Sequence, residues 1–223
     1  GKKVLSIDID PQGNSTSGFG IDKNRLEYTI YDVLIEDYDI NKIICKTEIE
    51  NLDIIPANIQ LAGAEIELTN TKYREKTLRE KINLIEKNYD FIIIDCPPSL
   101  GLLSLNALTA STSVLIPIQC EYYSLEGVGQ LIDTVKLVRE NLNPKLKIEG
   151  VLLNMFDGRT NLSIQVVEEV KKYFKDKVYR TVIPRSVRLA EAPSFGQPIM
   201  LYDDKSKGST AYIKLSEEFI KNN

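Results

Sequence analysis

The chain has 223 residues, of which 43% are hydrophobic and 27% charged, and its formal net charge is −4. This balance is typical of a globular protein and excludes the disordered, collagen-like and coiled-coil classes. The longest apolar stretches, such as residues 91–94, are much shorter than the ~20 residues of a membrane-spanning helix, and the sequence does not start with a secretory signal. We therefore expect a cytoplasmic protein.

Two residue types limit the chemistry that the chain can perform. Histidine is absent, which excludes Ser-His-Asp and Cys-His nucleophilic sites and argues against a catalytic zinc site. The three cysteines, Cys45, Cys96 and Cys120, match neither a disulfide framework nor a C-x-x-C metal site, and we expect them to be reduced and mostly buried. Catalysis then depends on carboxylates, lysines, backbone amides or a hard metal ion such as magnesium.

Short apolar runs alternate with helical patterns along the chain. The pattern predicts an α/β fold, with a doubly wound, mostly parallel sheet and helices on both faces. Strands are predicted over residues 4–9, 52–55, 91–94, 114–118, 148–153 and 178–183. Helices are predicted around residues 78–85, 125–142, 166–174 and 210–220. Because no linker, repeat or change in composition marks a boundary, we expect one domain over residues 1–223.

Acidic residues follow the first and third predicted strands. Asp8 and Asp10 stand two residues apart beside a glycine-containing turn, which places both on one side of a strand and suits metal coordination or water activation. Asp95 ends the apolar run of residues 91–94, as in a Walker B element that holds magnesium through water. Asp95 could instead cap the following helix.

Basic residues are concentrated in the last third of the chain. Residues 151–223 contain 12 Lys and Arg against 9 Asp and Glu, whereas residues 1–150 contain 16 against 23. Seven of the basic residues lie between positions 171 and 188, together with one acid, Asp176. Such a run forms either a solvated face or a surface that contacts nucleic acid.

Two nucleotide-binding motifs are missing from the sequence. The 223 residues contain no G-x-x-x-x-G-K-[ST] loop for phosphates and no Asn-Lys-x-Asp motif for guanine. If a purine nucleotide binds, adenine is therefore the expected base.

Six runs that together cover almost the whole chain resemble ParA/Soj-type chromosome and plasmid partitioning ATPases. They are GKKVLSIDIDPQGNSTSGFGI, LDIIPANIQLAGAEIEL, YDFIIIDCPPSLGLLSLNALTA, VLIPIQCEYYSLEG, IEGVLLNMFDGRTNLS and VYRTVIPRSVRLAEAPSFGQPI. In that family a deviant Walker A loop with two lysines, and then a helix, precede the strand at residues 4–9. The resemblance implies that the first strand, this loop and the first helix, on the order of thirty residues, lie upstream of Gly1.

The resemblance also implies roles for individual residues. Asp10 corresponds to the residue that orients the attacking water, Asp8 to the acid beside it near magnesium, and Asp95 to the Walker B carboxylate. For the acid pair, a turn-forming Asx motif before Pro11 is the structural alternative. The residues that correspond to the border of the adenine site are Asn154, Met155, Pro184 and Arg185.

Arg159 and Arg188 match the positions at which Soj-like proteins contact DNA. The family resemblance implies an ATP-dependent DNA-partitioning switch with ATP and Mg²⁺ as cofactors. The resemblance also implies an ATP-bound homodimer that binds DNA non-specifically and a ParB/Spo0J-like centromere-binding partner that stimulates hydrolysis. We therefore expect a nucleoid-associated protein that does not bind membranes.

Two alternatives to this function stay open. One is a MinD-like membrane-recruited ATPase, against which the short and acidic C-terminal segment argues. The other is a non-catalytic adaptor that has lost nucleotide binding. Because the 223 residues contain no phosphate-binding loop, we expect that on their own they do not hydrolyse ATP.

Overall fold

The computed structural model describes residues 1–121 and 124–223, and for residues 124–126 it describes the backbone alone. The middle of the run VLIPIQCEYYSLEG, at residues 122–123, therefore lies outside the described residues. The chain forms two compact units. The first contains Gly1–Thr112 and Leu137–Lys145, and the second contains Ser113–Lys136 and Leu146–Asn223.

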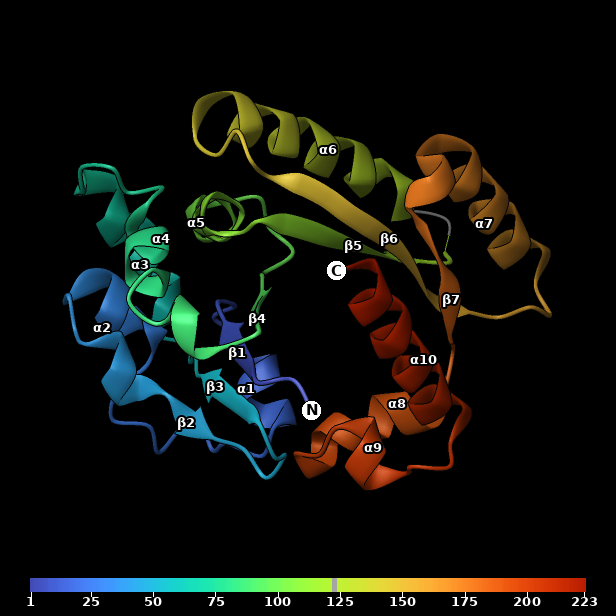
Figure 1. Ribbon diagram of the computed structural model, residues 1–223, viewed down its shortest axis with the longest axis horizontal. Helices are drawn as coiled ribbons and strands as arrows, with labels where there is room; N and C mark the ends of the chain where they lie inside the picture. The colour runs from blue at the N-terminus through green and yellow to red at the C-terminus, as the bar shows by residue number, and fades with distance from the viewer. Residues whose placement is uncertain (122–123) are drawn as a thin grey trace. The chain divides into compact units, whose positions relative to one another are not determined.

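The first unit is built on a four-stranded sheet in the order β2-β3-β1-β4 (Figure 1). Strands β3, β1 and β4 are parallel, and β2 is an antiparallel edge strand. The strands are β1 Val4–Asp8, β2 Cys45–Lys46, β3 Leu52–Ile55 and β4 Phe91–Asp95. The helices are α1 Asn14–Gly18, α2 Ile30–Ile35, α3 Leu61–Glu67, α4 Thr77–Ile82 and α5 Leu102–Ala110. In register, Asp8 lies opposite Asp95, so β1 and β4 end side by side.

Strand β1 is the central strand of this core. Leu5 and Ile7 are fully buried and Ser6 is nearly so, as expected for a parallel strand that is covered on both faces. Helix α4 has no side-chain cap of its own, and Asn106 of α5 supplies one by accepting a hydrogen bond from the Leu78 amide at 3.1 Å. The Asn106 amide group also donates to the Arg74 carbonyl. A buried side chain of α5 therefore fixes where α4 begins.

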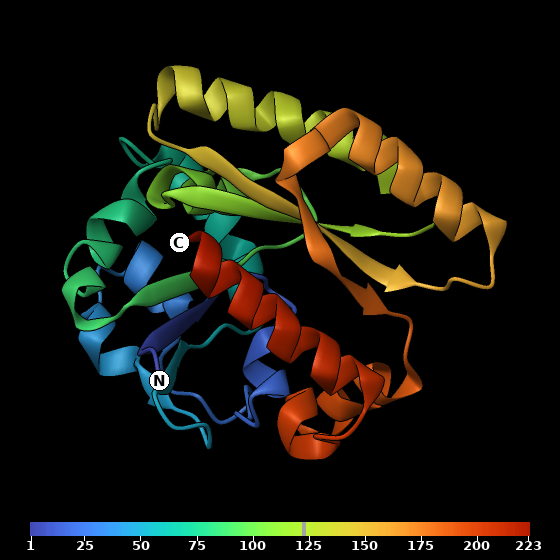
Figure 2. The same cartoon turned by 45° about the vertical axis from the view of Figure 1, so that its right-hand side comes forward.

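The second unit is built on a three-stranded parallel sheet in the order β5-β6-β7. The strands are β5 Ser113–Gln119, β6 Lys147–Phe156 and β7 Val178–Pro184. The helices are α6 Ser124–Asn141, α7 Asn161–Phe174, α8 Val187–Glu191, α9 Ile199–Tyr202 and α10 Lys207–Asn222. Figure 2 shows α7 on one face of this sheet and α10 on the other.

The side chains of β6 explain why helices lie on both faces of this sheet, because successive side chains of a strand point to opposite faces. Val151 and Leu153 pack with Val166 and Val170 of α7. Leu152, between them, packs in a separate cluster with Ala211 of α10. The sheet is therefore apolar on both faces and is covered on both.

The sequence-based prediction of an α/β fold with mostly parallel strands is confirmed. The expectation about the cysteines is partly wrong, since Cys120 is buried but Cys45 is half-buried and Cys96 is exposed. Among the described residues, no helix is long and apolar enough to cross a membrane. The assignment of residues 1–223 to a single domain stays a prediction.

Candidate functional site

Asp8 ends β1 as a fully buried carboxylate with several hydrogen-bond donors. Its Oδ2 accepts from the Thr16 amide and hydroxyl, both at 2.8 Å, and its Oδ1 accepts from the Asp10 amide at 3.1 Å. The Thr16 hydroxyl in turn accepts from the Ala57 amide at 3.0 Å. Burial raises the pKa of Asp8 above its usual value, although the hydrogen bonds from Thr16 and Asp10 oppose the shift. Asp8 thus joins β1, α1 and the segment after β3.

Asp10 lies beyond the end of β1, in a turn, so the alternation of a strand no longer sets its direction. Its Oδ1 accepts from the Gln12 amide at 2.9 Å, which is the Asx turn considered as the structural alternative. Its Oδ2 has no hydrogen-bond partner among the described residues. Gly13 closes the turn with φ +61°, and a Cβ atom there would stand 2.7 Å from the Ala57 carbonyl oxygen. The turn therefore leaves one oxygen of Asp10 available to a ligand or water.

Asp95 is exposed at the end of β4. Its Oδ2 accepts from the Ser15 hydroxyl at 2.6 Å, and its backbone carbonyl accepts from the Ile9 amide at 2.9 Å. The next helix, α5, starts after Gly101, and that helix has no side-chain cap. The alternative that Asp95 caps the following helix is therefore wrong. The structure brings Asp8, Asp10 and Asp95 together at one end of the first sheet.

These carboxylates fit part of a magnesium site. Among the described residues, no group of three or more acids and cysteines is arranged to hold a metal ion. Nucleotide-bound magnesium needs only one or two protein carboxylates, because phosphates and waters complete its shell. Of the predicted ligands, Asp95 is exposed, whereas Asp8 is buried and already accepts three hydrogen bonds from Thr16 and Asp10. The role of either residue as a magnesium ligand stays a prediction.

The region around Asp95 is electrostatically negative. Partial desolvation, followed by the charges of Asp95 and Asp10, raises the pKa of Cys96 to about 12. A thiol with that pKa stays protonated at neutral pH and is therefore a poor nucleophile. The same negative charge favours a cation beside Asp95.

The four residues predicted to border adenine lie together at the carboxyl ends of two neighbouring strands of the second unit. The Asn154 side chain accepts from the Met155 amide at 2.8 Å, and Met155 has a φ of +53°. Pro184 lies opposite Phe156 in the sheet, and the Arg185 amide donates to the Phe156 carbonyl at 2.9 Å. The Arg185 side chain pairs with Glu121. Ligands gather at such strand ends in open α/β sheets.

Both arginines predicted to contact DNA make ion pairs within the chain. Arg159 donates two hydrogen bonds to Asp157, from Nε to Oδ1 at 2.9 Å and from Nη2 to Oδ2 at 2.7 Å. The Arg159 hydrogen bonds hold the pKa of Asp157 down at about 2. Arg188 lies 3.2 Å from Glu191 and 3.4 Å from Asp203. A phosphate must therefore compete with carboxylates at both positions.

Sequence reasoning missed Ser15 and Thr16, whose hydroxyls hold Asp95 and Asp8. The available signal was the pair of hydroxyl residues directly after the glycine turn, at the start of a helix. Ser and Thr are common at helix starts as caps, so the pattern alone does not show that these hydroxyls reach back to strand ends.

Curated relatives match almost the whole chain, and a family model matches part of it. An AAA domain family matches residues 1–148. The sporulation initiation inhibitor protein Soj of Bacillus subtilis is 63% identical over 222 residues, which cover 100% of this chain and 88% of that protein. The chromosome partitioning protein ParA of Myxococcus xanthus is 53% identical over 220 residues, covering 99% of this chain and 78% of that protein.

A solved structure extends the likeness to the fold. Cobyrinic acid a,c-diamide synthase from Mycobacterium smegmatis, with a bound ATP analogue and magnesium, superposes with a TM-score of 0.86 at 36% identity. The match covers 99% of this chain and 83% of that one. Together with the sequence relatives, these matches show that the chain belongs to the ParA/Soj family of chromosome-partitioning ATPases.

Proposed function

We propose that the chain is an ATP-dependent DNA-partitioning switch that uses Mg²⁺. The ATP-bound homodimer binds DNA non-specifically, and a ParB/Spo0J-like partner stimulates hydrolysis and release, which makes the protein nucleoid-associated. The 63% identity to Soj and the ATP analogue and magnesium in the cobyrinic acid a,c-diamide synthase structure support this proposal.

The observation that carries the proposal is that Asp8, Asp10 and Asp95 lie together at one end of the first sheet. The free Oδ2 of Asp10 accepts a hydrogen bond from the attacking water and so orients it towards the γ-phosphate. Asp95 would hold magnesium through water, and Asp8 lies beside this site and keeps the turn that carries Asp10 in place. When bound, Mg²⁺ neutralises charge on the phosphate oxygens. No covalent nucleophile is needed, which agrees with a chain that has no histidine.

The second unit provides the remaining contacts. Asn154, Met155, Pro184 and Arg185 border the adenine ring from the strand ends where they lie. Arg159 and Arg188 contact DNA phosphates. Both arginine side chains are exposed, and a phosphate that binds them takes the place of their carboxylate partners.

Replacement of Asp10 tests the proposal. The form to use is the extended chain, which we define as these 223 residues with a two-lysine loop segment of the ParA/Soj family joined in front of Gly1. Asp10→Ala in the extended chain keeps Mg-ATP binding but slows hydrolysis by about 100-fold or more, since the water is no longer oriented. Asp22→Ala removes an exposed aspartate elsewhere in the first unit and serves as the control.

Single-turnover hydrolysis and equilibrium ATP binding are measured side by side on both variants. Normal turnover by Asp10→Ala, or a loss of ATP binding with that variant alone, would show that Asp10 does not position the water.

A further inference from the structure

Two neighbouring residues of α1 bind the last residues of two neighbouring strands. The Ser15 hydroxyl donates to Oδ2 of Asp95 in β4 at 2.6 Å, and the Thr16 hydroxyl donates to Oδ2 of Asp8 in β1 at 2.8 Å. The surroundings of the two contacts differ, because Thr16 and Asp8 are fully buried, whereas Ser15 is half-buried and Asp95 is exposed. Of the two contacts, a ligand from solvent can therefore reach the one between Ser15 and Asp95.

The sheet fixes the backbone of Asp95, but a single hydrogen bond fixes its carboxylate. The backbone carbonyl of Asp95 accepts from the Ile9 amide at 2.9 Å. Among the described residues, Ser15 alone donates a hydrogen bond to the carboxylate. The last torsion of an aspartate side chain has broad energy wells, so an exposed carboxylate without a partner samples many orientations. The hydrogen bond from Ser15 therefore selects one orientation of the Asp95 carboxylate.

This arrangement leaves one oxygen of Asp95 available. Ser15 occupies Oδ2, and Oδ1 has no hydrogen-bond partner in the part of the chain that the structure describes. Carboxylates that hold metal ions are commonly hydrogen-bonded themselves, and these outer contacts orient them. A donor that fixes one oxygen and leaves the other free therefore suits a carboxylate that holds Mg²⁺ through water.

We propose that Ser15 is a positioning residue for magnesium, whose hydroxyl holds the Asp95 carboxylate in the orientation that binds a water of the Mg²⁺ shell. This inference rests on the proposed function, since it concerns the metal ion of that function. The alternative is that Ser15 only attaches α1 to β4. A contact of that kind stabilises the fold to the same extent with and without the metal ion, so the two roles can be measured separately.

The test compares Ser15→Ala with Ser17→Ala in the extended chain. Both changes remove one hydroxyl from α1, but the Ser17 hydroxyl donates to the Gly13 carbonyl at 3.1 Å and not to a carboxylate. Calorimetry measures the affinity for ADP once with Mg²⁺ and once with EDTA, so hydrolysis does not contribute to the result. Melting curves establish that each variant is folded.

Ser15→Ala should weaken ADP binding by about 10-fold with Mg²⁺, at the lower end of the roughly 10- to 100-fold losses for outer contacts of a metal site. It should leave ADP binding in EDTA unchanged. Ser15→Thr, which keeps the hydroxyl, should restore the affinity with Mg²⁺, and Ser17→Ala should match the unsubstituted chain. An unchanged affinity of Ser15→Ala with Mg²⁺, the same loss in EDTA, or the same loss in Ser17→Ala would overturn the inference.

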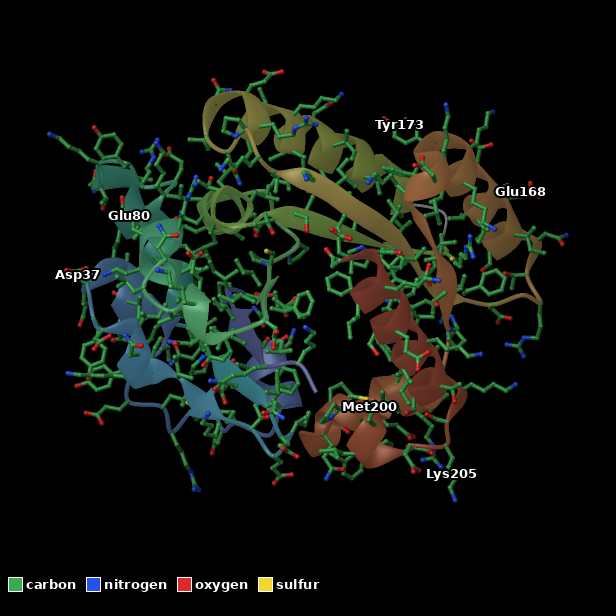
Figure 3. The ribbon with its side chains drawn as sticks, in the orientation of Figure 1. Asp37, Glu80, Glu168, Tyr173, Met200 and Lys205 are labelled. Atoms are coloured by element: carbon green, nitrogen blue, oxygen red, sulfur yellow. The ribbon has the colours of Figure 1, made fainter. Side chains whose placement is uncertain are left out.

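A double-mutant cycle tests whether Ser15 acts through Asp95. In the Asp95→Ala variant, the further change Ser15→Ala should have no additional effect on the affinity with Mg²⁺, because the carboxylate that Ser15 orients is gone. Glu80→Ala removes one negative charge from an exposed position on α4, which Figure 3 labels, and is the control for Asp95→Ala. An additional loss in the double variant would show that Ser15 does not act through Asp95 and would overturn the inference.

Two further outcomes separate the inference from the proposed function. If Mg²⁺ does not change the ADP affinity of the unsubstituted extended chain, the role of the metal ion in the proposed function fails, and the inference fails with it. If Asp95→Ala removes the effect of Mg²⁺ but Ser15→Ala does not reduce it, the inference alone is overturned and the proposed function stands.

Discussion

Asp8, Asp10 and Asp95 show how the surroundings give one residue type three roles. Asp8 is buried and its oxygens accept three hydrogen bonds, so it holds backbone segments together. Asp10 keeps one oxygen free in a turn, and Asp95 is exposed with a single hydroxyl partner. The hydrogen-bond donors around each carboxylate therefore decide its role. Asp8 is structural, whereas Asp10 and Asp95 keep oxygens that can bind water or a metal ion.

The two arginines give a prediction about DNA at this scale. Arg159→Ala and Arg188→Ala in the extended chain should each weaken binding by a similar factor for all DNA sequences. Each should also lower the salt slope by roughly one phosphate contact and leave basal ATP hydrolysis unchanged. A loss confined to particular DNA sequences, measured with a panel of duplexes, would argue against backbone contacts.

A second prediction concerns Asp53, which is nearly buried in β3. Burial opposes ionisation of Asp53, but hydrogen bonds from Lys46, at 2.8 and 2.9 Å, and from Tyr89, at 2.9 Å, lower its pKa below the usual 3.8. A lowered pKa stabilises the fold above pH 4, and that contribution disappears as the pH falls through the folded-state pKa. Asp53→Asn should therefore reduce the free energy of unfolding by about 1–3 kcal/mol at pH 7.

Urea unfolding at several pH values measures this effect. The difference between Asp53→Asn and the unsubstituted chain should shrink towards acidic pH, and Asp22→Asn, at an exposed ion pair, should change little. A difference independent of pH between 2 and 7 would mean that the Asp53 charge does not stabilise the fold.

At the scale of elements, the strands were predictable and several helices were not. The six predicted strands match β1, β3, β4, β5, β6 and β7 to within a few residues, because buried parallel strands are continuous apolar runs. Helix α5 was missed because residues around most of its circumference are buried, which removes a one-sided apolar pattern. Helix α1 is short, and its position depends on a carboxylate of β1.

In the candidate site, too, the residues at strand ends were predictable and the residues of a helix were not. The proximity of Asp8, Asp10 and Asp95 was predictable because strand ends are visible in sequence. The contacts of the Ser15 and Thr16 hydroxyls depend on how α1 folds back. Local sequence shows which groups are available, and tertiary hydrogen bonds decide which of them stay free.

The turn between β1 and α1 gives a prediction with a matched control. Gly13→Ala forces an alanine into φ +61° and places its Cβ 2.7 Å from the Ala57 carbonyl oxygen, so it should lower the free energy of unfolding by about 1–3 kcal/mol. Gly18→Ala, at the last residue of α1, where a Cβ atom would have nothing within 4 Å, should be neutral or stabilising. Equal effects of both in urea unfolding would mean that the turn tolerates a side chain.

At the scale of the whole molecule, charge and function are divided along the chain. The first unit contains the three aspartates, and the second contains the strand ends that we assign to adenine. The first 150 residues are net acidic and the remainder is net basic. Within the 223 residues, no glycine loop with a lysine balances Asp8, Asp10 and Asp95.

One measurement tests whether the sheet end that carries Asp8, Asp10 and Asp95 binds phosphates only when the two-lysine loop is present. It is a calorimetric titration with Mg-ATP of the 223-residue chain and of the extended chain. Amides and a lysine of a glycine loop hold the β- and γ-phosphates, whereas neighbouring carboxylates repel them. We predict micromolar binding at one site per extended chain and no measurable binding to the 223 residues. Micromolar binding by the 223-residue chain, or none by the extended chain, would contradict the assignment.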